Sequence, residues 1–240
     1  MPRAVVCLPT YNERENLEAM VQALADVLDP SRDRVLVIDD SSPDGTGELA
    51  DRLAKRLPWV SVIHRERKDG IGPAYVAGFR QALADGAELV LEMDCDFSHD
   101  PGDVPRLLAA ASDADLVLGS RYAKGGGTEN WGLLRRFVSR GGCIYAQAIL
   151  GIGVRDLTGG FKCFRRTTLD AIDLDALSAH GYAFQIETTY RVLRAGLTVR
   201  EIPIRFVERR AGSSKMTTSI VAEAVWKVPL LRLRALTGRL

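Results

Sequence analysis

Short runs of β-branched and other apolar residues alternate with segments of helical periodicity along the first half of the chain. The runs that predict strands span residues 4–8, 34–38, 59–63, 88–93 and 116–118. Between them, apolar residues recur every three or four positions, as at Leu17, Met20, Val21, Leu24 and Leu28. Alternating strands and helices indicate βαβ units on a mostly parallel sheet.

Capping signals mark where two of these helices begin. Asn12, with Glu15 three residues later, predicts a capping box at the start of the first helix. Asp100, followed by Pro101, predicts an N-cap with proline in the first turn of a later helix. Both helices are therefore expected to follow the carboxyl end of a strand.

The pattern changes after the fifth expected strand. Three glycines at 125–127 indicate a flexible loop, and a helix is expected over 131–149. An extended piece over 156–164, a helix over 183–195 and a strand over 198–207 follow. The sheet is therefore expected to become mixed in this half, giving an α/β fold flanked by helices.

The segment 217–240 is expected to be an amphipathic, basic extension of a single domain that spans 1–216. Residues 200–240 contain nine Lys/Arg and three Asp/Glu. Apolar side chains recur at helical spacing on both sides of Pro229, which predicts two short helices that meet there. Such a segment can lie in a membrane interface or pack on the protein's own core, and the sequence leaves both open.

The composition mainly excludes classes of protein. With 46% hydrophobic residues, 26% charged residues and a formal net charge of +1, the 240-residue chain is typical of a globular protein without an overall field for nucleic acid. The four cysteines form no CxxC pair, which argues against disulfides or zinc and favours buried thiols. The apolar runs are too short for a membrane span or an export signal, so a cytoplasmic protein is expected.

Two carboxylates at the end of an apolar strand are the sharpest chemical signal. Asp94 and Asp96 project to the same side and converge at the carboxyl edge of the sheet. At ~4 Å and an effective dielectric constant of about 20 their repulsion is roughly 4 kcal/mol, enough to raise one pKa or to require a cation. Oxygen ligands suit Mg²⁺ or Mn²⁺. An acidic helix-capping loop is the alternative explanation.

Polar residues follow three of the expected strands. Residues 9–13 follow the first strand, Asp39 and Asp40 end the second, and the paired carboxylates follow the fourth. Open α/β sheets bind ligands at this edge, so a nucleotide cleft is expected there. Since the first turn lacks GxGxxG, a Rossmann oxidoreductase is disfavoured, and the absence of GxxxxGK[ST] excludes a P-loop NTPase.

A set of motifs within residues 4–216 resembles a known family. The motifs are PTYNE at 9–13, DDSSPDGT at 39–46, DCDFSH at 94–99, GSRY at 119–122, SRG at 139–141, TGGF at 158–161, FQIE at 184–187 and SSK at 213–215. Their order is similar to that of family 2 glycosyltransferases, most of all polyprenol (dolichol) phosphate mannose synthases. The resemblance implies a GT-A-type fold, Mg²⁺ or Mn²⁺ dependence, and inverting transfer of mannose from GDP-mannose to a polyprenyl (dolichyl-type) phosphate.

The resemblance also implies roles for individual residues on the donor side. The nucleoside would be held by Pro9, Tyr11, Glu13, Ile38 and Asp40, with Asp39 beside them. The diphosphate and the metal would meet Asp94, Cys95 and Asp96, with Ser98 in the position of a third metal ligand. Arg209 and Lys215 would close over the donor diphosphate. Many relatives have Ala in place of Cys95 and Gln in place of Ser98.

On the acceptor side the chemistry calls for positive charge. A polyprenyl phosphate is anionic near neutral pH and attacks without losing a proton, so no strong base is needed. Arg121 and Arg135 would neutralise the acceptor phosphate, with Arg136 and Arg140 as further candidates. Together with Asp96, the first two are the residues expected to be catalytic.

Two further residues have competing interpretations. Glu187 would orient the acceptor arginines or the sugar hydroxyls, or else form an ordinary salt bridge. His99 follows the paired carboxylates and is expected to be a polar loop residue. Among the tryptophans, Trp59 is expected to fill the core.

Other functions stay open from the sequence. A polyprenyl-phosphate glycosyltransferase that uses another donor, such as UDP-glucose, would have the same fold and acceptor. A nucleotide-sugar-binding or membrane-scaffold protein without catalysis is disfavoured because the acidic pair and the distal Arg and Lys are present. The expected partners are GDP-mannose, a polyprenyl phosphate lipid and a membrane surface, but not nucleic acid. The expected location is the cytoplasm, peripheral at the cytoplasmic face of the membrane.

Overall fold

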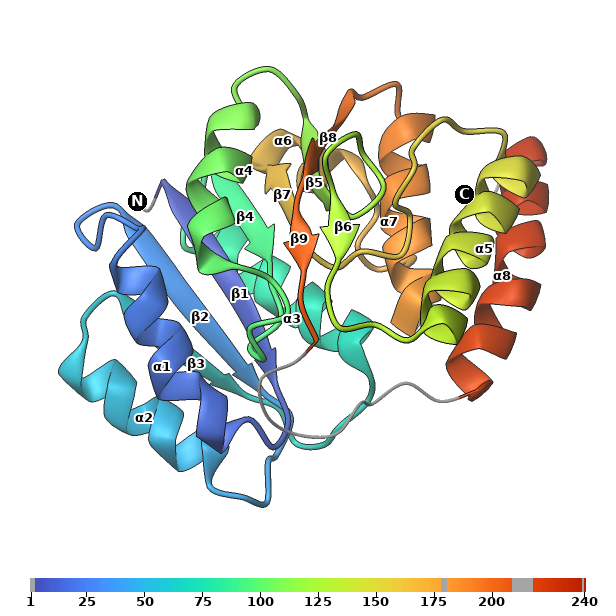
Figure 1. Cartoon of the computed structure of the whole chain (residues 1–240). Coiled ribbons are helices and arrows are strands. Elements are labelled where there is room, and N and C mark those ends of the chain that lie inside the picture. Colours follow the sequence, from blue (N-terminus) through green and yellow to red (C-terminus); the bar gives the residue numbers. More distant parts are fainter. Residues whose placement is uncertain (1–2, 178–180, 209–217, 239) are drawn as a thin grey trace.

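The computed structural model describes residues 3–177, 181–208, 218–238 and 240 (Figure 1). The strands are β1 (Ala4–Thr10), β2 (Asp33–Asp39), β3 (Val60–His64), β4 (Leu89–Glu92), β5 (Leu116–Ser120), β6 (Gly127–Thr128), β7 (Lys162–Arg165), β8 (Val199–Pro203) and β9 (Arg205–Phe206). The helices are α1 (Arg14–Ala25), α2 (Thr46–Arg56), α3 (Ile71–Ala84), the 3-10 turn η1 (Pro101–Asp103), α4 (Val104–Ala110), α5 (Leu133–Leu150), α6 (Arg166–Ala171), α7 (Gly181–Arg194) and α8 (Thr218–Leu236).

The main sheet is mixed and mostly parallel, as the alternating pattern predicts. Over the described residues it has seven strands in the order β3-β2-β1-β4-β7-β5-β8. Only β7 runs antiparallel to its neighbours, β4 and β5. The strand expected over 198–207 is instead two strands: β8 pairs with β5, and β9 leaves the main sheet to pair with β6. At the break, the Ile204 N–H donates to Ser120 O at 3.1 Å.

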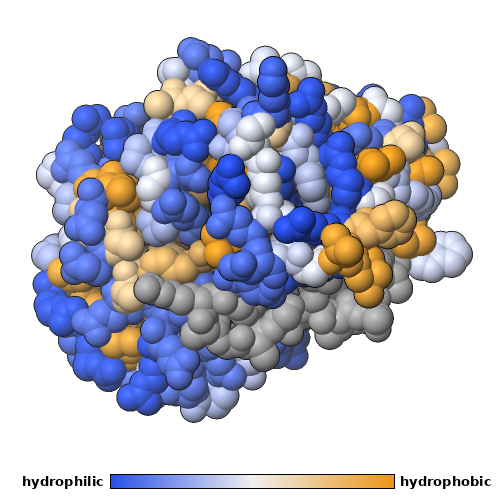
Figure 2. Space-filling model, in the orientation of Figure 1, coloured by the Kyte–Doolittle hydropathy of each residue, from blue (hydrophilic) through white to orange (hydrophobic). Residues whose placement is uncertain are grey.

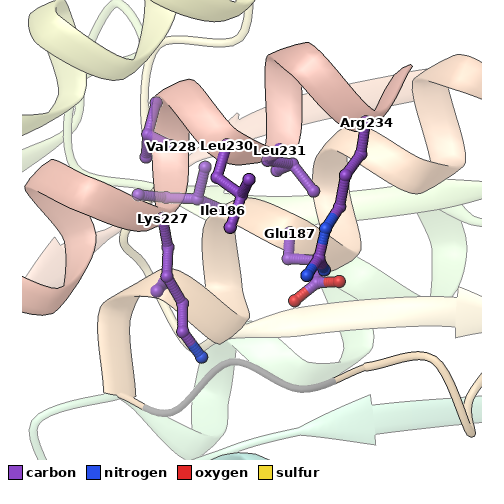
Figure 3. A pocket seen from close by; sticks show the side chains of 8 residues that line it. Ile186, Glu187, Lys227, Val228, Leu230, Leu231 and Arg234 are labelled. Atoms are coloured by element: carbon purple, nitrogen blue, oxygen red, sulfur yellow. The ribbon is translucent and has the colours of Figure 1, made fainter. Parts of the chain in front are cut away.

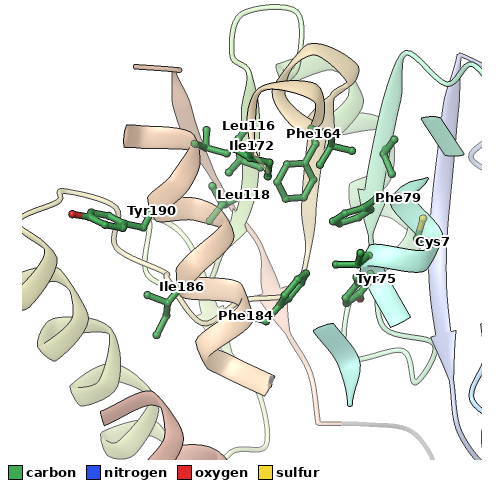
Figure 4. Close-up of a cluster of buried hydrophobic side chains, with 14 of the residues drawn as sticks. Cys7, Tyr75, Phe79, Leu116, Leu118, Phe164, Ile172, Phe184, Ile186 and Tyr190 are labelled. Atoms are coloured by element: carbon green, nitrogen blue, oxygen red, sulfur yellow. The ribbon is translucent and has the colours of Figure 1, made fainter. Parts of the chain in front are cut away.

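Helices cover both faces of this sheet, and β1 shows how one strand serves two cores. Val5 and Cys7 enter the cluster built with α3, α5, α7 and α8. Val6 and Leu8 enter the cluster built with α1, α2 and α4. Successive side chains of a strand point to opposite faces, which explains the continuous apolar run. Figure 4 shows the first cluster, where Tyr75 of α3 stacks on Phe184 of α7 with ring centroids 6.1 Å apart.

The C-terminal segment differs from the expected pair of helices. A single helix, α8, runs through Pro229, which is inside it. Proline has no N–H to donate to the carbonyl of Val225, four residues earlier. The Tyr145 hydroxyl of α5 donates to that carbonyl instead, at 2.9 Å. The lost helical hydrogen bond is thus replaced from a neighbouring helix, and the prediction of two helices was wrong.

Part of α8 packs on the protein's own core. Val228, Leu231 and Ala235 are buried and belong to the same cluster as α3 and α7. Other apolar side chains of the helix stay exposed, among them Trp226 at 81%. None of the helices in the described part of the chain is long and apolar enough to cross a membrane.

Of the local features predicted from the sequence, the capping box was wrong, and the second cap, the buried cysteines and the core tryptophan were confirmed. The capping box at Asn12 was wrong: Asn12 adopts a left-handed conformation, its N–H donates to Ser42 Oγ at 3.0 Å, and α1 begins at Arg14. Asp100 does cap, since its side chain accepts from the Gly102 N–H ahead of η1 and α4. All four cysteines are buried and free, and Trp59 lies in the second cluster, as expected.

Candidate active site

A cavity of about 620 Å³ opens at the carboxyl edge of the sheet. The residues expected at the site that line it are Pro9, Tyr11, Glu13, Asp40, Asp94, Cys95, Asp96, Ser98, Arg121 and Arg135. Lining residues that sequence reasoning did not assign include Lys68, Asp69, Gly70, Ile71, Tyr182, Gln185 and Phe206. The fold therefore brings together residues up to 197 positions apart, from Pro9 to Phe206.

Other expected site residues lie elsewhere. Ile38 is fully buried in the core and packs against Gly78 of α3, so its side chain does not line the cavity. Asp39 also lies outside the lining: it accepts from the Ser42 hydroxyl at 2.6 Å and from the Thr10 hydroxyl at 3.1 Å, and so holds the turn after β2. Arg209 and Lys215 fall outside the described residues.

At one end of the cavity, Asp40 is held by an ion pair. Arg65 Nη1 lies 2.5 Å from Asp40 Oδ1, and the carboxylate side chain is 8% exposed. Burial raises the pKa of Asp40, and the attraction of Arg65 opposes that shift. The same end contains Tyr11, whose ring carries the Lys68 ammonium 4.0 Å from its centroid.

The paired carboxylates lie in the loop after β4. Phe97 adopts a positive φ of 61°, and the Ser98 N–H turns back to donate to Asp96 Oδ1 at 3.0 Å. Asp96 is buried, whereas the Asp94 side chain is 33% exposed. The loop therefore aims both carboxylates into the cavity.

The donor atoms of this loop fit a hard divalent cation. The buried hydroxyl of Ser98 has no hydrogen-bond partner among the described residues, so its lone pairs are available to a ligand. Within the same part of the chain no three His, Cys, Asp or Glu side chains gather as a metal cage. Two carboxylates and a hydroxyl leave coordination positions open, as Mg²⁺ sites that bind substrate phosphates do.

His99 is a structural part of the site rather than the expected polar loop residue. It is 1% exposed and stacks on Phe161, with centroids 4.9 Å apart. Its Nδ1 accepts from the Asp94 N–H at 3.2 Å. Burial lowers the pKa of His99 to about 4, so the ring is neutral and acts as an acceptor that holds the Asp94 backbone. A histidine directly after an acidic motif was the only sequence signal.

Arg121 lines the cavity, and its guanidinium forms an ion pair with the buried carboxylate of Asp156. Its Nε and Nη2 donate to Asp156 at 2.7 and 2.6 Å, and the two side chains are 4% and 0% exposed. Burial alone would raise the pKa of Asp156, but the Arg121 guanidinium holds it below its usual value. Sequence reasoning noticed the stretch around Thr158 without assigning Asp156.

Arg135 is the arginine of α5 that lines the cavity. Its guanidinium lies 4.1 Å from the centroid of the Trp131 ring, and Nη1 donates to Glu208 at 2.6 Å. The buried Nε–H has no partner among the described residues, so it can donate to a ligand. Arg136 and Arg140 do not line the cavity, and the Arg140 guanidinium lies over the Tyr122 ring.

Two buried titratable side chains near the cavity were also missed. Glu92 and Lys162 are opposite each other in the β4–β7 register and are fully buried. Burial raises the pKa of Glu92 to about 7, opposed by Lys162, and lowers the pKa of Lys162 to about 8, opposed by Glu92. The Lys162 ammonium donates to Gln185 O at 2.8 Å and to the Thr188 hydroxyl at 3.0 Å, which ties α7 to the sheet.

Glu187 forms the ordinary salt bridge that was one of its two interpretations. Arg191 Nη2 lies 2.9 Å from its Oε1. Glu187 does not line the large cavity but a small hollow between α7 and α8, where Figure 3 shows it beside Arg234. Its role in orienting acceptor arginines is therefore not supported by its position.

The mixed, mostly parallel sheet and the acidic cavity at its carboxyl edge are those of a GT-A-type glycosyltransferase. Residues 5–173 match the model of the family described as glycosyl transferase family 2. An undecaprenyl-phosphate mannosyltransferase of Micrococcus luteus is 48% identical over 94% of this chain and 92% of its own. A polyprenol monophosphomannose synthase of Mycolicibacterium smegmatis is 46% identical over 94% of this chain and 85% of its own. The chain belongs to glycosyl transferase family 2.

Solved structures support the fold. Glucosyl-3-phosphoglycerate synthase from Mycobacterium tuberculosis, in complex with UDP, has a TM-score of 0.69 at 19% identity over 96% of this chain and 80% of its own. The same synthase with Mn²⁺, UDP-glucose and phosphoglyceric acid also has a TM-score of 0.69, at 20% identity over 96% of this chain and 79% of its own. At these identities the likeness establishes the GT-A-type architecture alone.

Proposed function

We propose that this protein transfers mannose, with inversion, from GDP-mannose to a polyprenyl (dolichyl-type) phosphate and so makes polyprenyl-phosphate mannose. Two relatives that are named for this kind of activity support the reaction. They are 46–48% identical to this chain over 94% of its length. The observation that carries the proposal is one cavity that joins the acidic pair Asp94 and Asp96 to Arg135. A donor diphosphate and an acceptor phosphate, which are both anionic, can thereby meet in one place.

Asp94, Asp96 and Ser98 would hold Mg²⁺ or Mn²⁺ in this scheme. The ion, when bound, would offset the charge of the nucleoside diphosphate leaving group. The buried Ser98 hydroxyl, which has no hydrogen-bond partner in the described part of the chain, supports this assignment. We also propose that Pro9, Tyr11, Glu13 and Asp40 hold the nucleoside, beside Cys95 at the diphosphate; the assignments of Arg209 and Lys215 rest on the sequence alone.

Arg135 would bind the acceptor phosphate. Its stacking on Trp131 and its bond to Glu208 fix the guanidinium plane. The Nε–H, which has no partner among the residues that the structure describes, can donate to a phosphate oxygen. Phosphate is a sufficient nucleophile without a base. Arg121 would act differently, since its ion pair with Asp156 and its bond to the Thr158 hydroxyl at 2.8 Å shape the cavity wall.

A membrane surface would deliver the lipid. Exposed apolar side chains gather on the adjacent helices α5 and α8, at the right of Figure 2. This α5–α8 apolar face consists of Leu133, Leu134, Phe137, Val138, Ile144, Ile149, Val225, Trp226, Leu230, Leu233 and Leu236. Leu134 and Phe137 of this face flank Arg135 in the sequence. Insertion of the face into a bilayer would therefore bring a lipid phosphate to the Arg135 guanidinium.

Basic side chains lie beside this face and fit anionic headgroups. Arg136 and Arg140 are exposed on α5, and Arg234 is exposed on α8. Each basic residue near such a surface contributes about 1 kcal/mol to binding. We therefore propose peripheral binding at the cytoplasmic face of a membrane, with residues 1–216 as the glycosyltransferase domain and 217–240 as an extension that joins α5 in lipid contact.

The test supplies donors and acceptor separately. The full chain is incubated with Mg²⁺ or Mn²⁺, a polyprenyl phosphate, and radiolabelled GDP-mannose or UDP-glucose, and organic-extractable label is counted. We expect label only from GDP-mannose, in the β configuration of an inverting transfer. UDP-glucose is the second candidate donor because a structural neighbour was solved in complex with it. Transfer only from UDP-glucose would show that the proposed donor is wrong. No transfer from either would contradict the proposal.

A further inference from the structure

Lys68 is a cation at the nucleoside end of the cavity that has no part in the scheme above. It belongs to the loop between β3 and α3 and lines the cavity. Its side chain is exposed, so packing does not force its position. Even so, its Nζ lies 4.0 Å from the centroid of the Tyr11 ring, a distance at which the ring face attracts an ammonium. The ammonium therefore lies over the Tyr11 ring at the edge of the site.

The loop that carries Lys68 is anchored to the end of β2. The Arg65 N–H donates to Asp39 O at 2.8 Å. The Ser41 hydroxyl bonds to the carbonyls of Arg65 and Glu66 at 2.9 and 3.0 Å. These bonds fix the start of the loop against the turn after β2. Lys68 thus projects from a defined base, while its flexible stem leaves the ammonium free to move over a few ångströms.

An acceptor of opposite charge stands at the same end of the cavity. The Asp40 N–H donates to Thr10 O at 3.0 Å, and Arg65 binds Asp40 Oδ1 at 2.5 Å. The carboxylate is therefore fixed in place and keeps lone pairs on Oδ2 for a ligand. Lys68 is close enough to Asp40 to act on its charge. The cavity thus presents a fixed acceptor and a mobile donor to whatever base lies beside Tyr11.

We propose that Lys68 selects the nucleobase of the donor by binding O6 of guanine, while Asp40 accepts from N1–H and the 2-amino group. Guanine presents an acceptor and two donors in a row, which match this pair of side chains. Uracil offers one N–H between two carbonyls, and adenine presents a lone pair where guanine has N1–H. Lys68 would leave the Tyr11 ring as the base enters. The inference rests on the proposed function, since it names the residue that recognises its guanine donor.

The test measures nucleotide binding by calorimetry with the full chain and Mg²⁺. GDP, 6-thio-GDP, IDP and UDP are titrated into wild type and into Lys68→Met. We expect the substitution to weaken GDP binding about tenfold, the loss of one charge-assisted hydrogen bond. Replacing O6 by sulfur should weaken binding to wild type but not to Lys68→Met. Loss of the 2-amino group in IDP should cost both proteins equally, because that group faces Asp40.

Arg67→Met is the matched control. Arg67 is an exposed cation of the same loop that does not line the cavity, so its removal should leave all four affinities unchanged. Two results would overturn the role of Lys68 while leaving GDP as the donor nucleotide. One is that Lys68→Met loses as much affinity for UDP as for GDP. The other is that 6-thio-GDP binds Lys68→Met as much more weakly than GDP as it does in wild type. A wild type that binds UDP as tightly as GDP would instead overturn the proposed donor together with the inference.

Discussion

Removal of the carboxylate of Asp156 is the sharpest test of how the cavity wall at Arg121 is built. Three donors of Arg121 converge on Asp156: the backbone N–H at 2.9 Å, Nε at 2.7 Å and Nη2 at 2.6 Å. The two side chains are 4% and 0% exposed. Asp156→Asn keeps the shape of the side chain but leaves the guanidinium buried without a counter-charge. Breaking a buried pair in this way costs about 3–5 kcal/mol of folding free energy.

The assay is equilibrium unfolding in urea, with the free energy of unfolding extrapolated to water. An exposed pair of the same chain serves as the control. Arg205 and Glu129 are 3.3 Å apart with side chains 71% and 45% exposed, so Glu129→Gln should cost less than about 1 kcal/mol. Combining Arg121→Met with Asp156→Leu should recover much of the loss, because an apolar pair needs no desolvation of charge.

A loss below about 1 kcal/mol in Asp156→Asn would refute this reasoning. It would mean that Arg121 does not depend on Asp156 for charge compensation, and that its guanidinium is available to an acceptor phosphate after all. A double substitution as unstable as the single one would likewise place the cost in packing rather than in the unpaired charge.

Further predictions concern the metal, the acceptor, the membrane and pH. EDTA and Asp96→Ala should each reduce mannose transfer at least about 1000-fold, measured at saturating donor; retained turnover would contradict the metal assignment. Arg135→Ala should raise KM for polyprenyl phosphate about tenfold or more and spare GDP affinity, measured by calorimetry. Leu133 and Phe137 are 84% and 78% exposed, and burying each in a membrane is worth roughly 1.5 kcal/mol or more. Replacing both with Ser should therefore lower the affinity for liposomes about 100-fold, measured by sedimentation, and leave GDP binding unchanged. The pKa of His99 is about 4 in the folded protein against a usual 6.5, so the unfolded chain binds the proton at a higher pH than the folded one. Folding stability should therefore fall as the pH drops from 6.5 through 4. In thermal melts, His99→Gln should lose less stability over this interval than wild type.

The strands and most helices could be predicted because their signals are local. An apolar run such as 34–38 carries its own signature, and the ends of parallel strands must share an edge. This is why the sequence predicts that Asp40, Asp94 and Asp96 lie together, and all three line one cavity. The same logic does not place the side chain of Ile38, which is fully buried in the core beside α3 and does not line the cavity.

What could not be predicted depends on partners that are distant in sequence. Arg121 was interpreted from its motif, yet its state is set by a carboxylate 35 positions away. The continuity of α8 through Pro229 depends on a hydroxyl of Tyr145, 80 positions from the carbonyl it satisfies. His99 could be recognised as buried only after Phe161 was found stacked on it. Pairings of this kind have no periodicity, so no pattern along the chain announces them.

The short segment at β9 joins the two halves of the site. The Val207 N–H donates to Ser98 O at 3.2 Å, within the loop that carries the acidic pair. The Phe206 ring contacts His99 on one side, at 5.2 Å, and on the other the indole on which Arg135 stacks. Phe206 therefore lies between the loop that carries Asp94 and Asp96 and the stacked side chains of Trp131 and Arg135.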